Sequence, residues 1–244
     1  MAITYIFKRV EKKYMLTREQ YKYIAERLKS YMHPDRFYES DIRNIYFDNR
    51  TDELIETSLT KPAYKEKLRL RSYGSPSADS PVFFEIKKKY QGVVYKRRIS
   101  MTREEAYRYI RTGELPEHLV GNIPVEIDYM IRRYRLFPKA YIGYHRLALV
   151  GNNDPDLRIT FDSHIVSRYD DIRLESDKEG EQLLNPGNVL MEIKIPGAMP
   201  LWLAHILSEK CIFPQSFSKF GTAHIRRKQE AMFRQKSYKL AAGF

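Results

Sequence analysis

Residues 63–73 read A-Y-K-E-K-L-R-L-R-S-Y, and residues 82–98 read V-F-F-E-I-K-K-K-Y-Q-G-V-V-Y-K-R-R. Because alternate residues of a β-strand share a face, the first stretch predicts a strand with cations on one side and leucines on the other. The second stretch predicts two more such strands, joined by a turn at Gln91-Gly92. The charged faces carry Lys65, Lys67, Arg69, Arg71, Glu85, Lys87, Lys89, Lys96 and Arg98.

The same alternation recurs along the chain and predicts a single antiparallel sheet. It is seen around residues 9–13, where Arg9, Glu11 and Lys13 share a face, and again at 144–146, 158–162 and 189–195. Another strand, rich in aromatic and β-branched residues, is expected at 42–49. Periodicity alone leaves two arrangements open. The charged faces either point to water, or line the inside of a closed sheet whose apolar outer face is covered by helices.

Capping-box patterns predict two helices. T-R-E-Q (17–20) starts one over residues 17–31, which H-P-D (33–35) ends, and T-R-E-E (102–105) starts one that Gly113 closes. The other expected elements are a helix at 125–136, where helix and strand periods compete, a helix opened by Pro200, a polar connection at 51–58 and a loop at 75–81.

Composition limits the partners. The net charge of +12 and the pI near 9.5 indicate an anionic partner, which could be nucleic acid, a lipid surface or a phosphate chain. A single cysteine, Cys211, excludes a disulfide framework and a disulfide-linked partner. No run reaches the roughly 18 apolar residues of a membrane helix, and the N-terminus lacks a signal-peptide core, so we expect a cytoplasmic protein.

Side chains must bind any phosphate, because the chain has neither G-x-x-x-x-G-K-[ST] nor G-x-G-x-x-G. Arginine pairs two phosphate oxygens at once, and lysine adds a movable point charge. Two such cations about 6 Å apart repel by about 3 kcal/mol at an effective dielectric constant of about 20. Interleaved carboxylates would relieve that repulsion, and they are also the ligands that a divalent cation needs beside phosphate.

The ordered motifs from Phe7 to Phe220 resemble the VTC-type polyphosphate polymerase domain, which belongs to the CYTH group of triphosphate tunnel metalloenzymes. The motifs are E-K-K-Y (11–14), Y-F-D (46–48), K-L-R-L-R (67–71), E-I-K-K-K (85–89), Y-K-R-R (95–98), Y-H-R (144–146), R-I-T-F-D (158–162), L-M-E-I-K (190–194) and S-F-S-K-F (216–220). The resemblance implies an α+β, mainly antiparallel β fold: an eight-stranded closed tunnel barrel with a charged interior and helices packed outside. It also implies a tunnel domain over residues 1–225, followed by a basic C-terminal tail at 226–244.

The resemblance also implies roles for individual residues. Catalytic contacts to the transferring phosphates fall to Lys67, Arg69, Arg71, Arg146, Arg158 and Lys219. Binding of ATP and the phosphate chain falls to Lys13, Lys87, Lys96, Arg98, Lys194, Tyr144 and Ser218. The metal ligands would be Glu192, Glu85 and Glu11, and His145 is expected outside the barrel. For any one of these residues, the simplest alternative is a solvated strand face.

The implied reaction is metal-dependent transfer of the γ-phosphoryl group of ATP, with Mn²⁺ or Mg²⁺, to a growing polyphosphate chain. Related enzymes that hydrolyse triphosphates begin with E-x-E-x-K, whereas this chain has R-V-E-K-K (9–13), which favours the polymerase branch. A triphosphatase and a non-catalytic sensor of polyphosphate or inositol phosphates remain alternatives. Nucleic acid is disfavoured, because the recurring carboxylates would repel its phosphates. The basic tail is expected to be a solvated helix, or to contact an anionic membrane or a membrane-protein partner.

Overall fold

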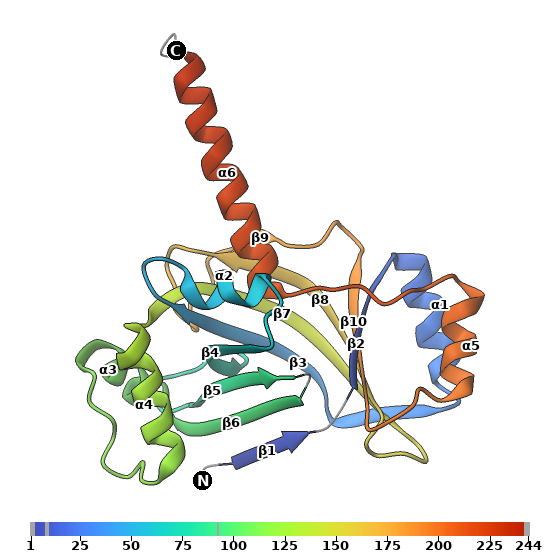
Figure 1. Ribbon diagram of the computed structural model, residues 1–244. Coiled ribbons are helices and arrows are strands. Elements are labelled where there is room, and N and C mark those ends of the chain that lie inside the picture. Colours follow the sequence, from blue (N-terminus) through green and yellow to red (C-terminus); the bar gives the residue numbers. More distant parts are fainter. Residues whose placement is uncertain (1–2, 8–9, 92, 242–244) are drawn as a thin grey trace.

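The structure is a computed structural model that describes residues 3–7, 10–91 and 93–241. One antiparallel sheet runs through it in the order β1-β6-β5-β4-β3-β7-β8-β10-β2, and β9 pairs with β8 beside this path (Figure 1). The strands are β1 (Ile3–Phe7), β2 (Val10–Leu16), β3 (Met32–Asp48), β4 (Tyr64–Tyr73), β5 (Pro81–Tyr90), β6 (Val93–Thr102), β7 (Phe137–Gly151), β8 (Arg158–Arg168), β9 (Glu181–Gln182) and β10 (Val189–Ile195). The helices are α1 (Arg18–Leu28), α2 (Glu53–Leu59), α3 (Arg103–Thr112), α4 (Asn122–Tyr134), α5 (Leu201–Glu209) and α6 (Lys219–Ala241).

The sheet curls on itself, but it is not closed by backbone hydrogen bonds. Among the described residues, β1 and β2 are its edges, so the expected eight-stranded closed barrel is wrong in both closure and strand number. Glu11 on edge strand β2 nevertheless lies 3.5 Å from Lys87 on β5, far along the strand order. Backbone pairing needs strands about 4.8 Å apart, whereas two long charged side chains can span a wider gap. We call the inward side of this curl the concave face.

Helices cover the outer, apolar face of the sheet on two sides. On β4 to β6, the outward residues Leu70, Phe84 and Ile99 are buried against α3 and α4, in a core that includes Tyr109 and Ile127. A second core joins the outer faces of β2, β8 and β10 to α1 and α5 (Figure 1). The predicted alternation, with apolar residues outside under helices and charges inside, is therefore confirmed for these strands.

Two helices depart from the expected external packing. The ring of Phe220 in the first turn of α6 stacks on Tyr46 with centroids 4.9 Å apart, and Ile55 of α2 belongs to the same buried cluster. Tyr46 lies opposite Arg69 in the β3–β4 register, and cross-strand neighbours share a face. Thus α2 and the start of α6 cover part of the concave face, and the remainder of α6 extends away from the body (Figure 1).

The capping boxes at Thr17 and Thr102 both form, and Gly113 ends α3 with a φ of 76°. The helix expected at 125–136 is also confirmed, as α4, and the helix opened by Pro200 as α5.

One expected helix is shorter than predicted, and one local prediction is wrong. The helix expected over 17–31 ends at Leu28, before H-P-D, and residues 33–35 belong to β3, whose residues 32–34 pair with 149–151 of β7. Residues 51–58 are not an irregular connection, because most of them form α2. The carboxylate of Asp48 accepts hydrogen bonds from the backbone N–H groups of Leu54 and Ile55 at 3.0 and 2.9 Å, which supplies the cap that the local sequence lacks.

Arg9, predicted on the charged face with Glu11, lies outside the described residues. Within the described part of the chain, no helix combines the length and the apolar character needed to span a membrane.

Removing the Phe84 side chain should destabilise the fold strongly. Its ring is fully buried and contacts Phe47 and Tyr109, with centroids 5.6 and 5.7 Å away, so Phe84→Ala should lower the free energy of unfolding by about 3–5 kcal/mol. Urea unfolding measures this change. Phe37→Ala is the matched control, because Phe37 is 69% exposed and its loss should cost under about 0.5 kcal/mol. Equal losses in the two variants would contradict the packing described here.

Candidate functional site

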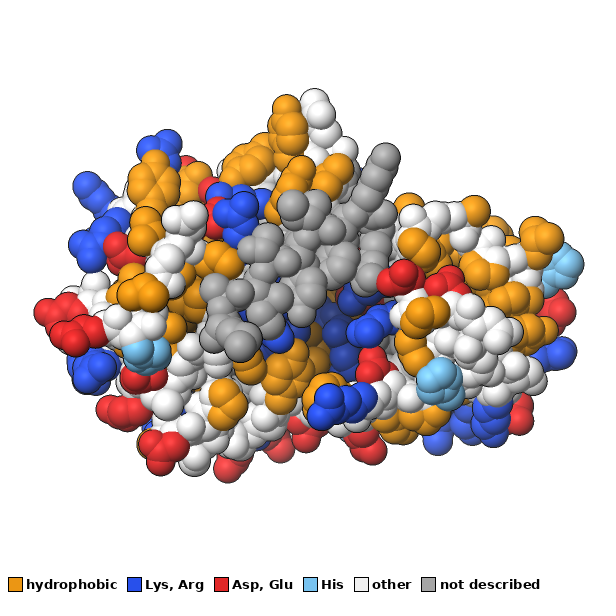
Figure 2. All heavy atoms as spheres, turned by 90° about the horizontal axis from the view of Figure 1, so that it is seen from below, with side chains coloured by type: hydrophobic (Ala, Val, Ile, Leu, Met, Phe, Trp, Pro, Cys, Tyr) orange, Lys and Arg blue, Asp and Glu red, His pale blue; other side chains and the backbone are white. Residues whose placement is uncertain are grey.

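The concave face gathers charged residues from strands that are far apart in the sequence. Seen from below, Lys and Arg side chains lie deep in a hollow near the middle of the molecule (Figure 2). The ion pairs of the concave face form two clusters, one centred on Glu85 of β5 and the other on Asp162 of β8 and Glu192 of β10.

In the first cluster, three cations surround one buried carboxylate. Arg69 and Lys96 lie 2.7 and 2.6 Å from the carboxylate of Glu85, and Arg71 lies 3.6 Å away. Burial alone would raise the pKa of Glu85, but Arg71, Arg69 and Lys96 together hold that pKa well below its usual value. Glu85 is therefore ionised and already paired with cations, so it organises cations more readily than it binds a metal ion.

The second cluster contains two buried carboxylates. Asp162 accepts two hydrogen bonds from Arg146, at 2.6 and 2.7 Å, and one from Lys219 at 2.5 Å. Glu192 lies 3.3 Å from Lys13, 3.4 Å from Lys219 and 3.6 Å from Arg146. Burial opposes ionisation of both carboxylates, but the neighbouring cations keep the pKa of each below its usual value. Lys219 contacts both carboxylates. Burial would lower the pKa of Lys219, but the attraction of Glu192 and Asp162 outweighs burial and raises that pKa.

Asp162 was missed in the sequence, where it is only the last residue of R-I-T-F-D. Its signal was its position in the alternation, because it falls on the same face as Arg158 and Thr160. Its neighbour Thr160 is also buried on this face, opposite Glu192, and its hydroxyl has no hydrogen-bond partner among the residues that the structure describes.

Tyrosine side chains connect the two clusters. The hydroxyl of Tyr144 accepts a 3.4 Å hydrogen bond from Arg71, while Arg146 and Lys219 lie over its ring at 5.1 and 4.5 Å from the centroid. Tyr46, also missed in the sequence, accepts a hydrogen bond from Arg69 at 3.1 Å. Burial would raise the pKa of Tyr46, but Arg69 and neighbouring cations lower it to about 8.

Lysines face one another across the strands between these clusters. Lys87 of β5 lies opposite Lys67 of β4 on one side and Lys96 of β6 on the other. Desolvation lowers the pKa of Lys67, Lys96 and Lys194 to about 8 each. Like charges directly opposite each other destabilise a sheet, so this arrangement favours an anionic ligand.

The segment before α6 completes the hollow. Lys67 donates to the hydroxyl of Ser218 at 3.1 Å, and Lys13 donates to the carbonyl oxygen of Phe217 at 3.0 Å. Together with Lys219, this segment brings the predicted S-F-S-K-F motif to the concave face.

The three predicted metal ligands do not converge. Glu11 and Glu192 lie near each other, both within 3.5 Å of Lys13, but Glu85 belongs to the other cluster. Among the described residues, no group of three histidine, cysteine or carboxylate side chains could hold a metal ion. The donors nevertheless fit Mg²⁺ or Mn²⁺, because such ions are commonly bound by one or two carboxylates together with the phosphates of the substrate. Glu192, with Glu11 beside it, is the donor set that fits.

Two predicted residues lie outside these clusters. Arg158 is half-exposed and pairs with Asp35 at 3.4 Å. Arg98 shares the face of Glu85 but rests on the ring of Phe83, 4.8 Å from its centroid. His145 was predicted to avoid the interior; it contacts Asp41 at 3.0 Å, as an exposed pair.

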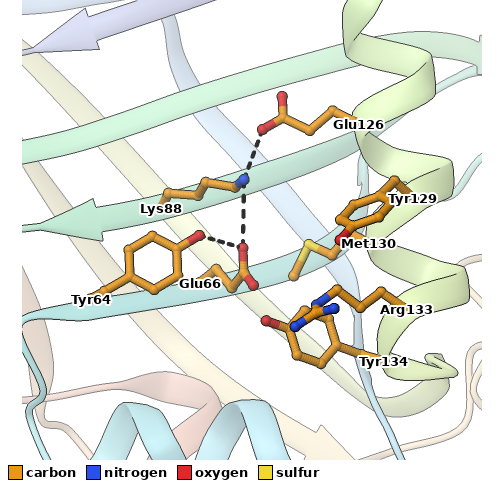
Figure 3. A pocket seen from close by; sticks show the side chains of 8 residues that line it. All are labelled: Tyr64, Glu66, Lys88, Glu126, Tyr129, Met130, Arg133 and Tyr134. Carbon is orange, nitrogen blue, oxygen red and sulfur yellow. Dashed lines mark hydrogen bonds and ion pairs between the residues drawn. The ribbon is translucent and has the colours of Figure 1, made fainter.

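A separate pocket of about 180 Å³ lies between the outer face of β4 and β5 and helix α4 (Figure 3). Lys88 lies between two carboxylates, 2.8 Å from Glu126 and 3.7 Å from Glu66, and Tyr64 donates to Glu66 at 2.8 Å. These groups satisfy one another, so this pocket is a structural ion-pair site and the concave face is the candidate functional site.

Comparison with known proteins agrees with this geometry. A family model described as VTC domain matches residues 8–225. Among solved structures, a candidate adenylate cyclase of Bacillus halodurans has 14% identity and a TM-score of 0.54, covering 87% of this chain and 95% of that one. A candidate adenylate cyclase of Vibrio parahaemolyticus has 11% identity and a TM-score of 0.46, covering 88% of this chain and 97% of that one. No curated protein matches. The similarity to the Bacillus halodurans structure shows that the two chains share a fold.

Stability should rise with pH above neutrality. Lys67, Lys96, Lys194 and Tyr46 have pKa values of about 8 when folded, below the values of about 10 in an unfolded chain. Below pH 8 all four are protonated in both states. Between about pH 8 and 10 the folded protein binds fewer protons, so its free energy of unfolding should increase, on the order of 1–3 kcal/mol in total.

Urea unfolding at about pH 7 and about pH 9.5 measures this increase. The double variant Lys67→Met and Lys194→Met should show a smaller rise, because two of the titrating groups are gone. A free energy of unfolding that falls over this interval would show that the lysines are not buried as described.

Proposed function

Because this chain belongs to the VTC domain family, we propose that it is a phosphoryl-transfer enzyme that extends polyphosphate with the γ-phosphoryl group of ATP. The observation that carries the proposal is the concave face itself, where Lys67, Lys87 and Lys96 lie opposite one another beside two arginine clusters. A bound chain of phosphates would reduce the repulsion between these lysines. Family membership and the shared fold support the broader assignment to an enzyme of triphosphate tunnel type.

The two clusters suit different tasks in this reaction. Arg146 and Lys219 are held by Asp162, so their positions are fixed before substrate arrives, which is the arrangement that stabilises charge on a transferring group. Lys67 and Lys87 of β4 and β5 are held less closely by carboxylates and offer movable charges that can follow a chain in several registers.

The proposed step is an in-line displacement at phosphorus. A terminal oxygen of the acceptor phosphate forms a bond to the γ-phosphorus of ATP, and the bond from that phosphorus to the oxygen bridging it to the β-phosphorus breaks. ADP leaves with the electron pair. The acceptor oxygen is already ionised at neutral pH, so no general base is required.

A metal ion, Mn²⁺ or Mg²⁺, would be held by Glu192 with Glu11 beside it and would neutralise charge on the phosphate oxygens. Lys13 lies within 3.5 Å of both carboxylates. Burial opposes ionisation of both, but nearby cations lower their pKa values, Lys87 and Lys13 for Glu11 and Lys219 and Lys13 for Glu192.

The carboxylates also favour transfer to phosphate over hydrolysis. Water is a poor nucleophile until a base removes its proton. The pKa values of Glu85, Glu192, Asp162 and Glu11 are all lowered, with nearby cations outweighing burial, so each is a weak base. A phosphate acceptor needs no such base.

Phosphorus NMR of the protein with ATP and Mn²⁺ or Mg²⁺ tests the activity directly. Internal phosphate resonances should appear together with ADP. Glu192→Gln should retain polyphosphate binding and lose most turnover, about 100-fold or more. Glu179→Gln, an exposed carboxylate, is the matched control and should behave as the parent. Orthophosphate without chain growth would indicate a triphosphatase, and binding without turnover would indicate a sensor.

Thermal unfolding in the presence of polyphosphate measures how much each proposed phosphate-binding residue contributes to stabilisation by the ligand. Ligand at about a hundredfold excess over its Kd should stabilise the parent protein by about 2.7 kcal/mol. Arg69→Ala should lose most of this gain, whereas Arg158→Ala should lose little, because Arg158 is half-exposed and paired with Asp35. If the Arg69 variant gains as much as the parent protein, the concave face is not the polyphosphate site.

A further inference from the structure

A larger hollow, of about 580 Å³, lies beside the pocket of Figure 3. Tyr134 at the end of α4 lines both. The walls of the larger one come from the turn between β3 and α2 and from the junction of α4 with β7: Asn49, Arg50, Thr51, Tyr134, Arg135 and Phe137. Its volume is within the range of about 300–1,000 Å³ that holds small organic ligands. We call it the α4–β7 groove.

The groove presents two arginines without carboxylate partners. Arg50 and Arg135 are exposed, and neither forms an ion pair within the described part of the chain. The adjacent acid, Asp52, is neutralised by Lys139 at 2.7 Å. By contrast, Arg97 and Lys88 on the outer face of the sheet are both paired with Glu126. Two guanidinium groups that converge on one hollow suit a phosphate or carboxylate.

Aromatic rings form the other wall. Phe137 is 39% exposed, although it begins a strand, and Tyr134 is half-buried beside it. The ammonium group of Lys139, which is paired with Asp52, lies 5.3 Å from the centre of the Phe137 ring. Exposed rings next to arginines favour a ligand with a flat, conjugated ring as well as an anionic group.

The backbone on both sides of the groove is held in an uncommon conformation. Arg135 has a φ of 52° and Asp52 a φ of 58°, the left-handed region that residues with side chains seldom adopt. Arg135 is the left-handed C-cap of α4, and its conformation turns the chain from α4 into β7, which begins at Phe137. Such strained residues cluster at ligand sites.

We propose that the α4–β7 groove binds a nucleoside monophosphate or diphosphate, with its base against Tyr134 and Phe137 and its phosphate on Arg50 and Arg135. This site is distinct from the concave face, because α4 packs on the outer side of the sheet. A polyphosphate chain, which has no ring, matches the concave face and not the groove. The inference therefore stands independently of the proposed polymerase activity.

Titration calorimetry with AMP tests the groove, using the full chain presaturated with long-chain polyphosphate so that the concave face is occupied. A separate titration with polyphosphate alone verifies that occupation; if it shows no binding, the concave-face proposal fails while the AMP titration still reports on the groove. AMP should bind at one site per chain under both conditions, and orthophosphate should bind at least about 10-fold more weakly, because it lacks the ring.

Three variants locate the binding. Arg50→Gln combined with Arg135→Asn should weaken AMP at least about 10-fold, and asparagine tolerates the left-handed backbone at 135. Phe137→Leu should weaken AMP and leave orthophosphate unchanged. Arg108→Gln combined with Arg111→Gln, at two exposed arginines of α3, removes the same charge away from the groove and should leave AMP binding unchanged.

Loss of the AMP signal in the presence of polyphosphate, together with unchanged AMP binding by the Arg50 and Arg135 variant without polyphosphate, would assign nucleotide binding to the concave face and overturn the proposal. Undiminished AMP binding in the Arg50 and Arg135 variant, or absence of AMP binding to the parent chain, would overturn it as well.

Discussion

Mutual repulsion of cations on one face of a sheet is the constraint on which this structure depends. At about 6 Å and an effective dielectric constant of about 20, each pair costs about 3 kcal/mol, and the concave face contains many such pairs. Three buried carboxylates, Glu85, Asp162 and Glu192, oppose that repulsion. Each is shared by two or more cations, so removal of a single carboxylate would leave several buried charges without a partner.

The same carboxylates determine how open the protein remains to a ligand. They pair with the arginines of the two clusters and with Lys96, whereas Lys67, opposite Lys87, contacts the hydroxyl of Ser218 and no carboxylate among the described residues. Lys67 is therefore a cation of this face with little neutralisation by neighbouring acids. Tyr144, in contact with Arg71 of one cluster and with Arg146 and Lys219 of the other, makes the two clusters parts of one network.

Local pattern predicted much of this architecture, and tertiary context decided the rest. Alternation in residues 63–98 was sufficient to assign the two faces of β4 to β6, because a period of two has only one solution per strand. It could not identify Asp162 or Tyr46 as members of the site, since their partners come from other strands. Nor could it reveal α2, whose cap is supplied by Asp48 from outside the helical segment. Closure of the barrel was predicted from the resemblance, and this prediction was wrong. Between the edge strand β2 and β5, the charged side chains of Glu11 and Lys87 meet in place of backbone hydrogen bonds.

Lys219 is at once a partner of Asp162 and the first residue of α6. That helix has 23 residues, about 35 Å at 1.5 Å per residue, and it leaves the body of the protein (Figure 1). No flexible loop separates its exposed part from the charge network. A continuous helix therefore connects Lys219, and through it Asp162 and Glu192, to the segment that extends from the body, so that a tilt of α6 as a rigid unit would displace the ammonium group of Lys219 from both carboxylates.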